Sequence, residues 1–68
     1  HARVMLVEKD GVVFASNKDG LIMALDGKTG RLLWKHKTGN TMINTVEPLN
    51  RNRIVFTNEA GKVGEVRS

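Results

Sequence analysis

The fold of this chain is decided by the stretch Ala24-Leu25-Asp26-Gly27-Lys28-Thr29-Gly30-Arg31-Leu32-Leu33-Trp34. Its pattern is A-x-D-x-x-T-G-x-x-x-W, which we interpret as the end of one β-strand, a tight turn and a second strand. Gly27 and Gly30 can adopt left-handed backbone angles that a side chain would oppose. The carboxylate of Asp26 and the hydroxyl of Thr29 can accept hydrogen bonds from backbone amides in the turn. The pattern therefore predicts a glycine-rich hairpin.

The second strand of this hairpin carries Trp34, the single tryptophan of the chain. An indole offers a broad flat surface and one N–H donor, which needs a partner when the ring is buried. Ala24 is small and leaves room for a ring to lie against its strand. We therefore expect Trp34 to pack over a neighbouring sheet and to donate to a backbone carbonyl there. Such a contact would hold adjacent units together and would not be a catalytic site.

Short apolar runs separated by glycine-containing turns continue along the rest of the chain. Runs of four to seven residues rich in Val, Ile and Leu are typical of strands, and Asp-Gly pairs favour hairpin turns. The runs predict an all-β, antiparallel meander of about seven strands, near 3–8, 12–17, 21–26, 31–37, 42–48, 53–58 and 62–67. In the fourth run, alternation places Leu32 and Trp34 on one face. It places Arg31, Lys35 and Lys37 on the other. Pro48 cannot donate to a ladder, which indicates an edge strand.

The chain also repeats itself at a spacing of 42 residues. Asp10 to Asn17 aligns with Asn52 to Glu59, so that Phe14 falls on Phe56. A period of about 40 residues is typical of repeat architectures that include four-stranded propeller blades. We therefore expect residues 1–68 to be a single β-repeat segment. Unit one covers about 3–44, and an incomplete unit two covers about 45–68.

At these residues the sequence resembles a known family. Five positions match the tryptophan-docking motif of quinoprotein-like β-propellers, the repeats of pyrroloquinoline quinone (PQQ) dehydrogenases: Ala24, Asp26, Thr29, Gly30 and Trp34. The stretch from Gly11 to Asp26 also looks like the family's pattern. Unit two departs from the motif, because Glu65 and Arg67 stand where Ala24 and Asp26 stand. The resemblance implies a partial propeller of about one and a half blades.

The resemblance implies several roles for a parent protein. Some members are calcium- and PQQ-dependent dehydrogenases of the periplasm, and others are scaffolds, sensor domains or binding modules that lack the cofactor. A shared fold does not choose among these. From the resemblance we expect a non-enzymatic scaffold or binding module, located in the periplasm or outside the cell. The alternative is a piece of a PQQ-dependent dehydrogenase whose active site lies in other blades.

Composition limits the chemistry that this chain can perform. It has no cysteine for a disulfide or thiolate site, and His1 and His36 lie far apart in the sequence. Asp10, Asp19 and Asp26 all fall in predicted turns, where local hydrogen bonding explains them. We therefore expect no catalytic, cofactor-binding or metal-binding residues in this segment, although PQQ and calcium could bind elsewhere in a full-length parent. The apolar runs are too short to span a membrane.

The partners follow from the charge and the repeat. The net charge is +4, and the basic residues are spread along the chain. A small basic β-barrel that binds nucleic acid is a second alternative, although few aromatic residues are available for stacking. Because a blade has two faces to cover, we expect remaining propeller blades, further copies of the chain or another protein as partners. The chain begins at His1 and ends in a third strand of unit two, as a piece of a longer protein would.

Overall fold

The computed structural model describes residues 4–68, and this part of the chain is built from strands and turns without a helix. The seven strands are β1 (Val4–Lys9), β2 (Val12–Asn17), β3 (Leu21–Asp26), β4 (Leu32–Lys37), β5 (Ile43–Asn50), β6 (Arg53–Asn58) and β7 (Val63–Arg67). The predicted all-β meander is confirmed, with each strand within two residues of its expected bounds. Because the described residues hold no helix, they also hold no helical span long enough to cross a membrane.

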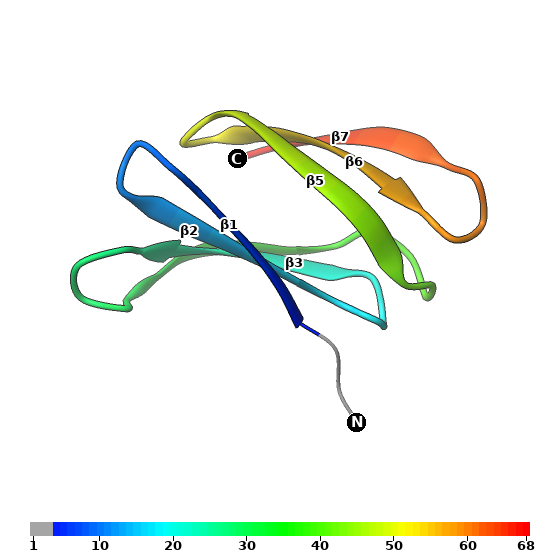
Figure 1. Cartoon of the computed structure of the whole chain (residues 1–68), viewed down its shortest axis with the longest axis horizontal. Coiled ribbons are helices and arrows are strands. Elements are labelled where there is room, and N and C mark those ends of the chain that lie inside the picture. The colour runs from blue at the N-terminus through cyan, green and yellow to red at the C-terminus, as the bar shows by residue number, and fades with distance from the viewer. Residues whose placement is uncertain (1–3) are drawn as a thin grey trace.

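The strands form two antiparallel sheets, one of four strands in the order β1-β2-β3-β4 and one of three in the order β5-β6-β7. Figure 1 shows them as two layers, with β5 passing over the first sheet near β1 and β2. Every neighbouring pair of strands is also consecutive in the sequence, so the connections are short hairpins. The residues from 38 to 42 carry the chain from one layer to the other.

A single hydrophobic core lies between the two layers. Along β2 the side chains alternate, and Val12 and Phe14 point into the core together with Ile22 and Ala24 of β3. The second sheet supplies the other half of the core: Ile43, Val46, Ile54, Phe56 and Val66. The two most deeply buried aromatic residues are Phe14 and Phe56, which are 1% and 2% exposed. Each sheet therefore covers one face of the other.

Strand β4 departs from the alternation that its sequence predicts. The register shifts between Ala24 and Leu25, so that Ala24 lies opposite Trp34 whereas Leu25 lies opposite Leu32. This β-bulge inserts one extra residue, Leu33, which packs against the core beside Trp34. The prediction that Leu32 and Trp34 share a face was therefore wrong. The extra residue places Leu32, which precedes it, on the opposite face of the sheet from Trp34.

Strand β5 is an edge strand of the second sheet and contains Pro48. The expectation from the proline is confirmed. Pro48 is buried and lies opposite Ile54, and the register with β6 is irregular between Pro48 and Asn50.

The turns of the two sheets show how many positions separate equivalent residues of the β2–β3 and β6–β7 hairpins. The side-chain oxygen of Asn17 accepts hydrogen bonds from the amides two and four residues later at 2.9 and 3.0 Å, and that of Asn58 does the same at 3.0 Å. Gly20 and Gly61 complete these turns with φ angles of +89° and +85°. Both pairs are 41 positions apart, and the cross-strand registers of the two hairpins agree with that separation.

At a separation of 41, Phe56 corresponds to Ala15, and Phe14 corresponds to Val55. The alignment of Phe14 with Phe56 was therefore wrong by one residue. The alignment matched two similar side chains at a spacing of 42, whereas strand and turn share a spacing of 41 in the structure. In a β-strand, a shift of one residue moves every side chain to the opposite face.

The corrected register shows how the two sheets are stacked. In the first sheet, the face that carries Phe14 packs against the second sheet. The equivalent face of the second sheet carries Val55, and it points away from the first sheet. The first sheet's other face carries Ala15, which corresponds to the buried Phe56. The two sheets are therefore stacked head to tail, each facing the same way along the stack.

Candidate functional site

The turn between β3 and β4 is organised by Asp26. Its Oδ1 accepts hydrogen bonds from the amides of Lys28 at 2.8 Å and Thr29 at 3.2 Å. Its carbonyl oxygen accepts from the amide of Gly30 at 2.8 Å, where a φ of +77° favours glycine. The hydroxyl of Thr29 accepts from the amide of Arg31 at 3.2 Å. Three of the five residues singled out in the sequence therefore build this turn.

These amides also change the acidity of the carboxyl group. The hydrogen bonds from the Lys28 and Thr29 amides lower the pKa of Asp26 below its ordinary value, because they stabilise the ionised form. The positive charges of Arg31 and Arg51 act in the same direction. A carboxylate held ionised in this way is a poor proton donor or acceptor near neutral pH. Its chemistry is that of a turn-stabilising group.

Ala24 and Trp34 lie in one cross-strand row with an aromatic neighbour. Ala24 is fully buried and stands between Phe14 on β2 and Trp34 on β4. Because a methyl group fills little of this row, the two rings approach each other across it. Their centroids are 6.0 Å apart at an interplanar angle of 54°, a tilted arrangement that aromatic pairs favour.

The indole of Trp34 then reaches the second sheet. Its Nε1 donates a hydrogen bond to the carbonyl oxygen of Arg51 at 3.2 Å. Arg51 lies in the turn between β5 and β6, 17 positions further along the chain. The contact therefore joins the last strand of the first sheet to the first hairpin of the second, at the partly buried margin of the core. A backbone carbonyl of the neighbouring sheet was the partner expected from the sequence.

The remaining polar residues do not gather into a metal-ligating cluster among the described residues. His36 is exposed on β4, and no three His, Cys, Asp or Glu side chains within residues 4–68 gather as a metal site requires. The nearest approach to a charged cluster lies on the second sheet's outward face. There Glu65 accepts hydrogen bonds from Arg53 at 2.8 Å and from Arg67 at 2.9 Å, which lower its pKa.

The outward face of the first sheet has an apolar centre, with Glu8 of β1 and Lys35 and Lys37 of β4 at its margins. We call it the open face, and it consists of Leu6, Val13, Ala15, Met23, Leu25 and Leu32. Leu6 is 65% exposed and Leu32 is 46% exposed. Ala15 is buried although it lies outside the core, because Leu6 and Met23 flank it on the neighbouring strands. An apolar face of this kind marks a contact surface more often than a surface that meets water.

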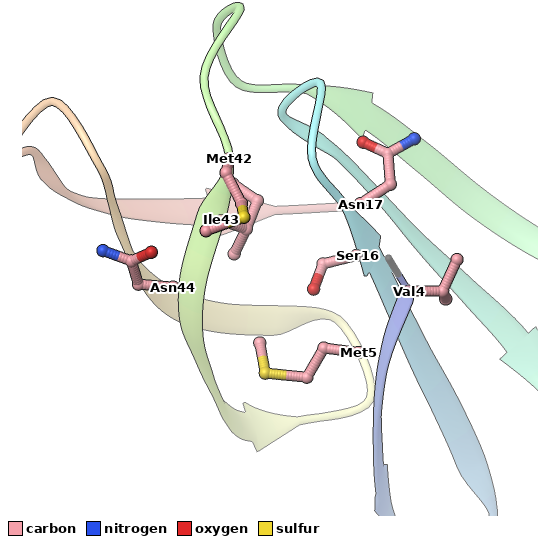
Figure 2. A pocket seen from close by; sticks show the side chains of 7 residues that line it. All are labelled: Val4, Met5, Ser16, Asn17, Met42, Ile43 and Asn44. Carbon is pink, nitrogen blue, oxygen red and sulfur yellow. The ribbon is translucent and has the colours of Figure 1, made fainter. Parts of the chain in front are cut away.

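A pocket of about 540 Å³ opens between the sheets beside the start of β1. Figure 2 shows the side chains of Met5 and Ser16 directed toward its interior, opposite Met42 and Ile43 at the start of β5. Ser16 is buried, and its hydroxyl finds no hydrogen-bond partner among the described residues. The lining combines thioether and aliphatic groups with one hydroxyl and the side-chain amides of Asn17 and Asn44, and none of the lining side chains is charged.

Comparison with known proteins finds no family model that matches this chain, and no curated protein and no solved structure that matches it. The geometry of the molecule therefore carries the functional argument alone. Sequence reasoning found Trp34 and the turn of Asp26, but it missed two features. The acceptor at Arg51 is a backbone carbonyl, which has no sequence signature. The open face was missed because the bulge in β4 and the one-residue shift of the repeat hid which side chains share a face.

Proposed function

We propose that this chain is a structural segment of a quinoprotein-like β-propeller, and that it acts as a scaffold or binding module rather than as an enzyme. The observation that carries the proposal is the head-to-tail stacking of the two sheets. In a repeat protein each unit contacts its neighbours through the same pair of faces. Phe56 lies on the face of the second sheet that packs against the first sheet. Its equivalent in the first sheet is Ala15, which lies on the open face, where a preceding unit would pack.

The hairpin of β3 and β4 supports the same proposal. Its residues Ala24, Asp26, Thr29, Gly30 and Trp34 form a rigid turn and an indole that is bonded to the next sheet. The carboxylate of Asp26 and the hydroxyl of Thr29 are both used in local hydrogen bonds. The motif would therefore serve to fix the position of one blade relative to the next, and any ligand or protein would be bound by the surface of the assembled blades.

An extended chain tests the head-to-tail stacking directly. We would place a second copy of residues 1–41 before His1, so that an added unit can lay its Phe14 face on the open face. We expect the free energy of unfolding to rise by at least about 1 kcal/mol, equivalent to roughly 4–8 °C in melting temperature for a small domain. Thermal unfolding followed by circular dichroism measures this.

The matched control is the same extended chain with Met23→Lys in its second unit, where a lysine would lie in the new junction. This control should lose most of the added stability. An extended chain that melts at or below the melting temperature of the original would contradict the propeller assignment.

Two titrations separate the alternatives. A saturable change in the absorbance of PQQ, when PQQ and calcium are added to the full-length parent protein, would favour the dehydrogenase alternative. Binding of an oligonucleotide with a steep salt dependence would favour the nucleic-acid alternative. We expect neither, because no three His, Cys, Asp or Glu side chains gather within residues 4–68 and few aromatic residues are available for stacking.

A further inference from the structure

We infer that the pocket between the starts of β1 and β5 binds a small neutral phenol, that is, an aromatic ring with one hydroxyl group. The inference goes beyond the propeller assignment and does not depend on it, because residues of this chain form the pocket. The volume of about 540 Å³ is typical of ligand pockets, and it is several times the roughly 150 Å³ in which benzene binds within a protein core.

The buried polar feature of this pocket is the hydroxyl of Ser16. Ser16 follows Val12 and Phe14 on the inward side of β2, where the alternation would place a third apolar side chain. The residue is 3% exposed, and its Oγ has no hydrogen-bond partner among the described residues. Because a buried hydroxyl without a partner is unfavourable, a ligand that supplies the partner gains from the hydrogen bond.

The second sheet shows the same position with its hydroxyl satisfied. The residue equivalent to Ser16 is Thr57, 41 positions later. Its hydroxyl lies 2.6 Å from that of Thr45, its cross-strand partner on β5. In the first sheet the cross-strand partner of Ser16 is Met5, whose thioether has no hydrogen to donate and is only a weak acceptor. The unpaired hydroxyl is therefore specific to the pocket.

Two methionines determine which ligand suits the rest of the lining. Figure 2 shows Met5 beside Ser16 and Met42 across the pocket from them. Met5 is half-buried and has three rotatable bonds, so it can move aside and let a ligand reach the hydroxyl. Thioether sulfur atoms make favourable contacts with aromatic rings, which favours an aromatic ligand. Because none of the lining side chains is charged, an ionised ligand would lose water without gaining an ionic partner.

Three ligands of similar size test the inference on the full chain: p-cresol, toluene, which lacks the hydroxyl, and p-toluate, which carries a charge. Nuclear magnetic resonance of labelled methionine methyl groups locates each ligand. We expect p-cresol to shift the signals of Met5 and Met42 saturably and to bind about fivefold more tightly than toluene. Met23 is the internal control, because it lies on the open face. p-Toluate should not bind saturably, although the net charge of +4 attracts it.

Ser16→Ala tests the hydroxyl itself. The variant should stay folded, because it loses only a hydroxyl without a partner, and its dissociation constant for p-cresol should rise about fivefold while that for toluene does not rise. Thr57→Ala is the matched control, because it removes the equivalent hydroxyl from the outward face of the second sheet, and it should bind p-cresol as the wild type does.

Three results would overturn the inference. The first is a wild-type chain that shows no saturable shift with p-cresol at millimolar concentrations. The second is equal affinity of the wild type and Ser16→Ala for p-cresol. The third is a shift of Met23 as large as those of Met5 and Met42, which would place the ligand on the open face. Because the extended chain of the propeller test measures stability and not ligand binding, either proposal can fail alone.

Discussion

At the scale of single residues, the smallest side chains fix the positions of the largest. Ala24 lets the rings of Phe14 and Trp34 meet across a strand. Gly64 performs a comparable task in the second sheet, where it lies opposite Phe56. A Cβ atom added at Gly64 would lie 2.7 Å from the ring of Phe56, so the ring rests directly on the glycine.

We therefore predict that Gly64→Ala destabilises the fold. The added methyl group would press on the buried ring of Phe56, and overpacking of this kind costs about 1–3 kcal/mol. Chemical denaturation measures the change in the free energy of unfolding. Gly39→Ala is the control, because a Cβ at Gly39 meets nothing within 4 Å and its φ is not left-handed. Equal effects in the two variants would contradict the contact.

At the scale of elements, the β3–β4 hairpin couples stability to pH. The lowered pKa of Asp26 means that the folded state favours the ionised carboxylate more than the unfolded state does. Its contribution is therefore complete above the unfolded pKa of about 3.9 and is lost as the pH falls further. Glu65 in the β6–β7 hairpin acts in the same direction, because Arg53 and Arg67 lower its pKa.

We predict that Asp26→Asn lowers the melting temperature at pH 7 and flattens its decline between about pH 5 and pH 2. The asparagine oxygen can still accept from the turn amides but carries no charge to be protonated. Adding Glu65→Gln should flatten the profile further. Melting temperatures measured across this pH range check the prediction, and an acid decline as steep as that of the wild type would contradict it.

The elements also show what the sequence could predict. The seven strands were predictable, because glycine turns separate runs too short for helices. The turn of Asp26 was predictable from hydrogen-bonding chemistry, and so was the hydrogen bond from the Trp34 indole to a backbone carbonyl of the second sheet. The β4 bulge was not, because a single extra residue leaves no sign in composition. The register of the repeat was not either, because Phe14 and Phe56 look alike, whereas the turns that set the register share only an asparagine and a glycine.

At the scale of the whole molecule, one core serves both sheets. A chain of this size buries only about 60% of its unfolded surface, and here the buried side chains of each sheet are covered by the other. Neither sheet should therefore be stable alone. The indole of Trp34 reports on the junction, since it contacts Phe14 in one sheet and the carbonyl of Arg51 in the other.

We predict that the two sheets unfold together. Denaturation followed by the fluorescence of Trp34, which reports the junction, should coincide with denaturation followed by far-ultraviolet circular dichroism, which reports all strands. A fluorescence transition at clearly lower denaturant would mean that the junction opens while the sheets persist, and it would contradict the shared core.

Pro48 has a consequence for the behaviour of the chain at high concentration. Fibrillar aggregates grow when a strand from another molecule adds to an exposed strand through an unbroken series of backbone hydrogen bonds. A proline has no amide hydrogen to give, and the irregular register beside Pro48 bends β5 away from a straight template. Amyloid-like growth along β5 is thereby discouraged.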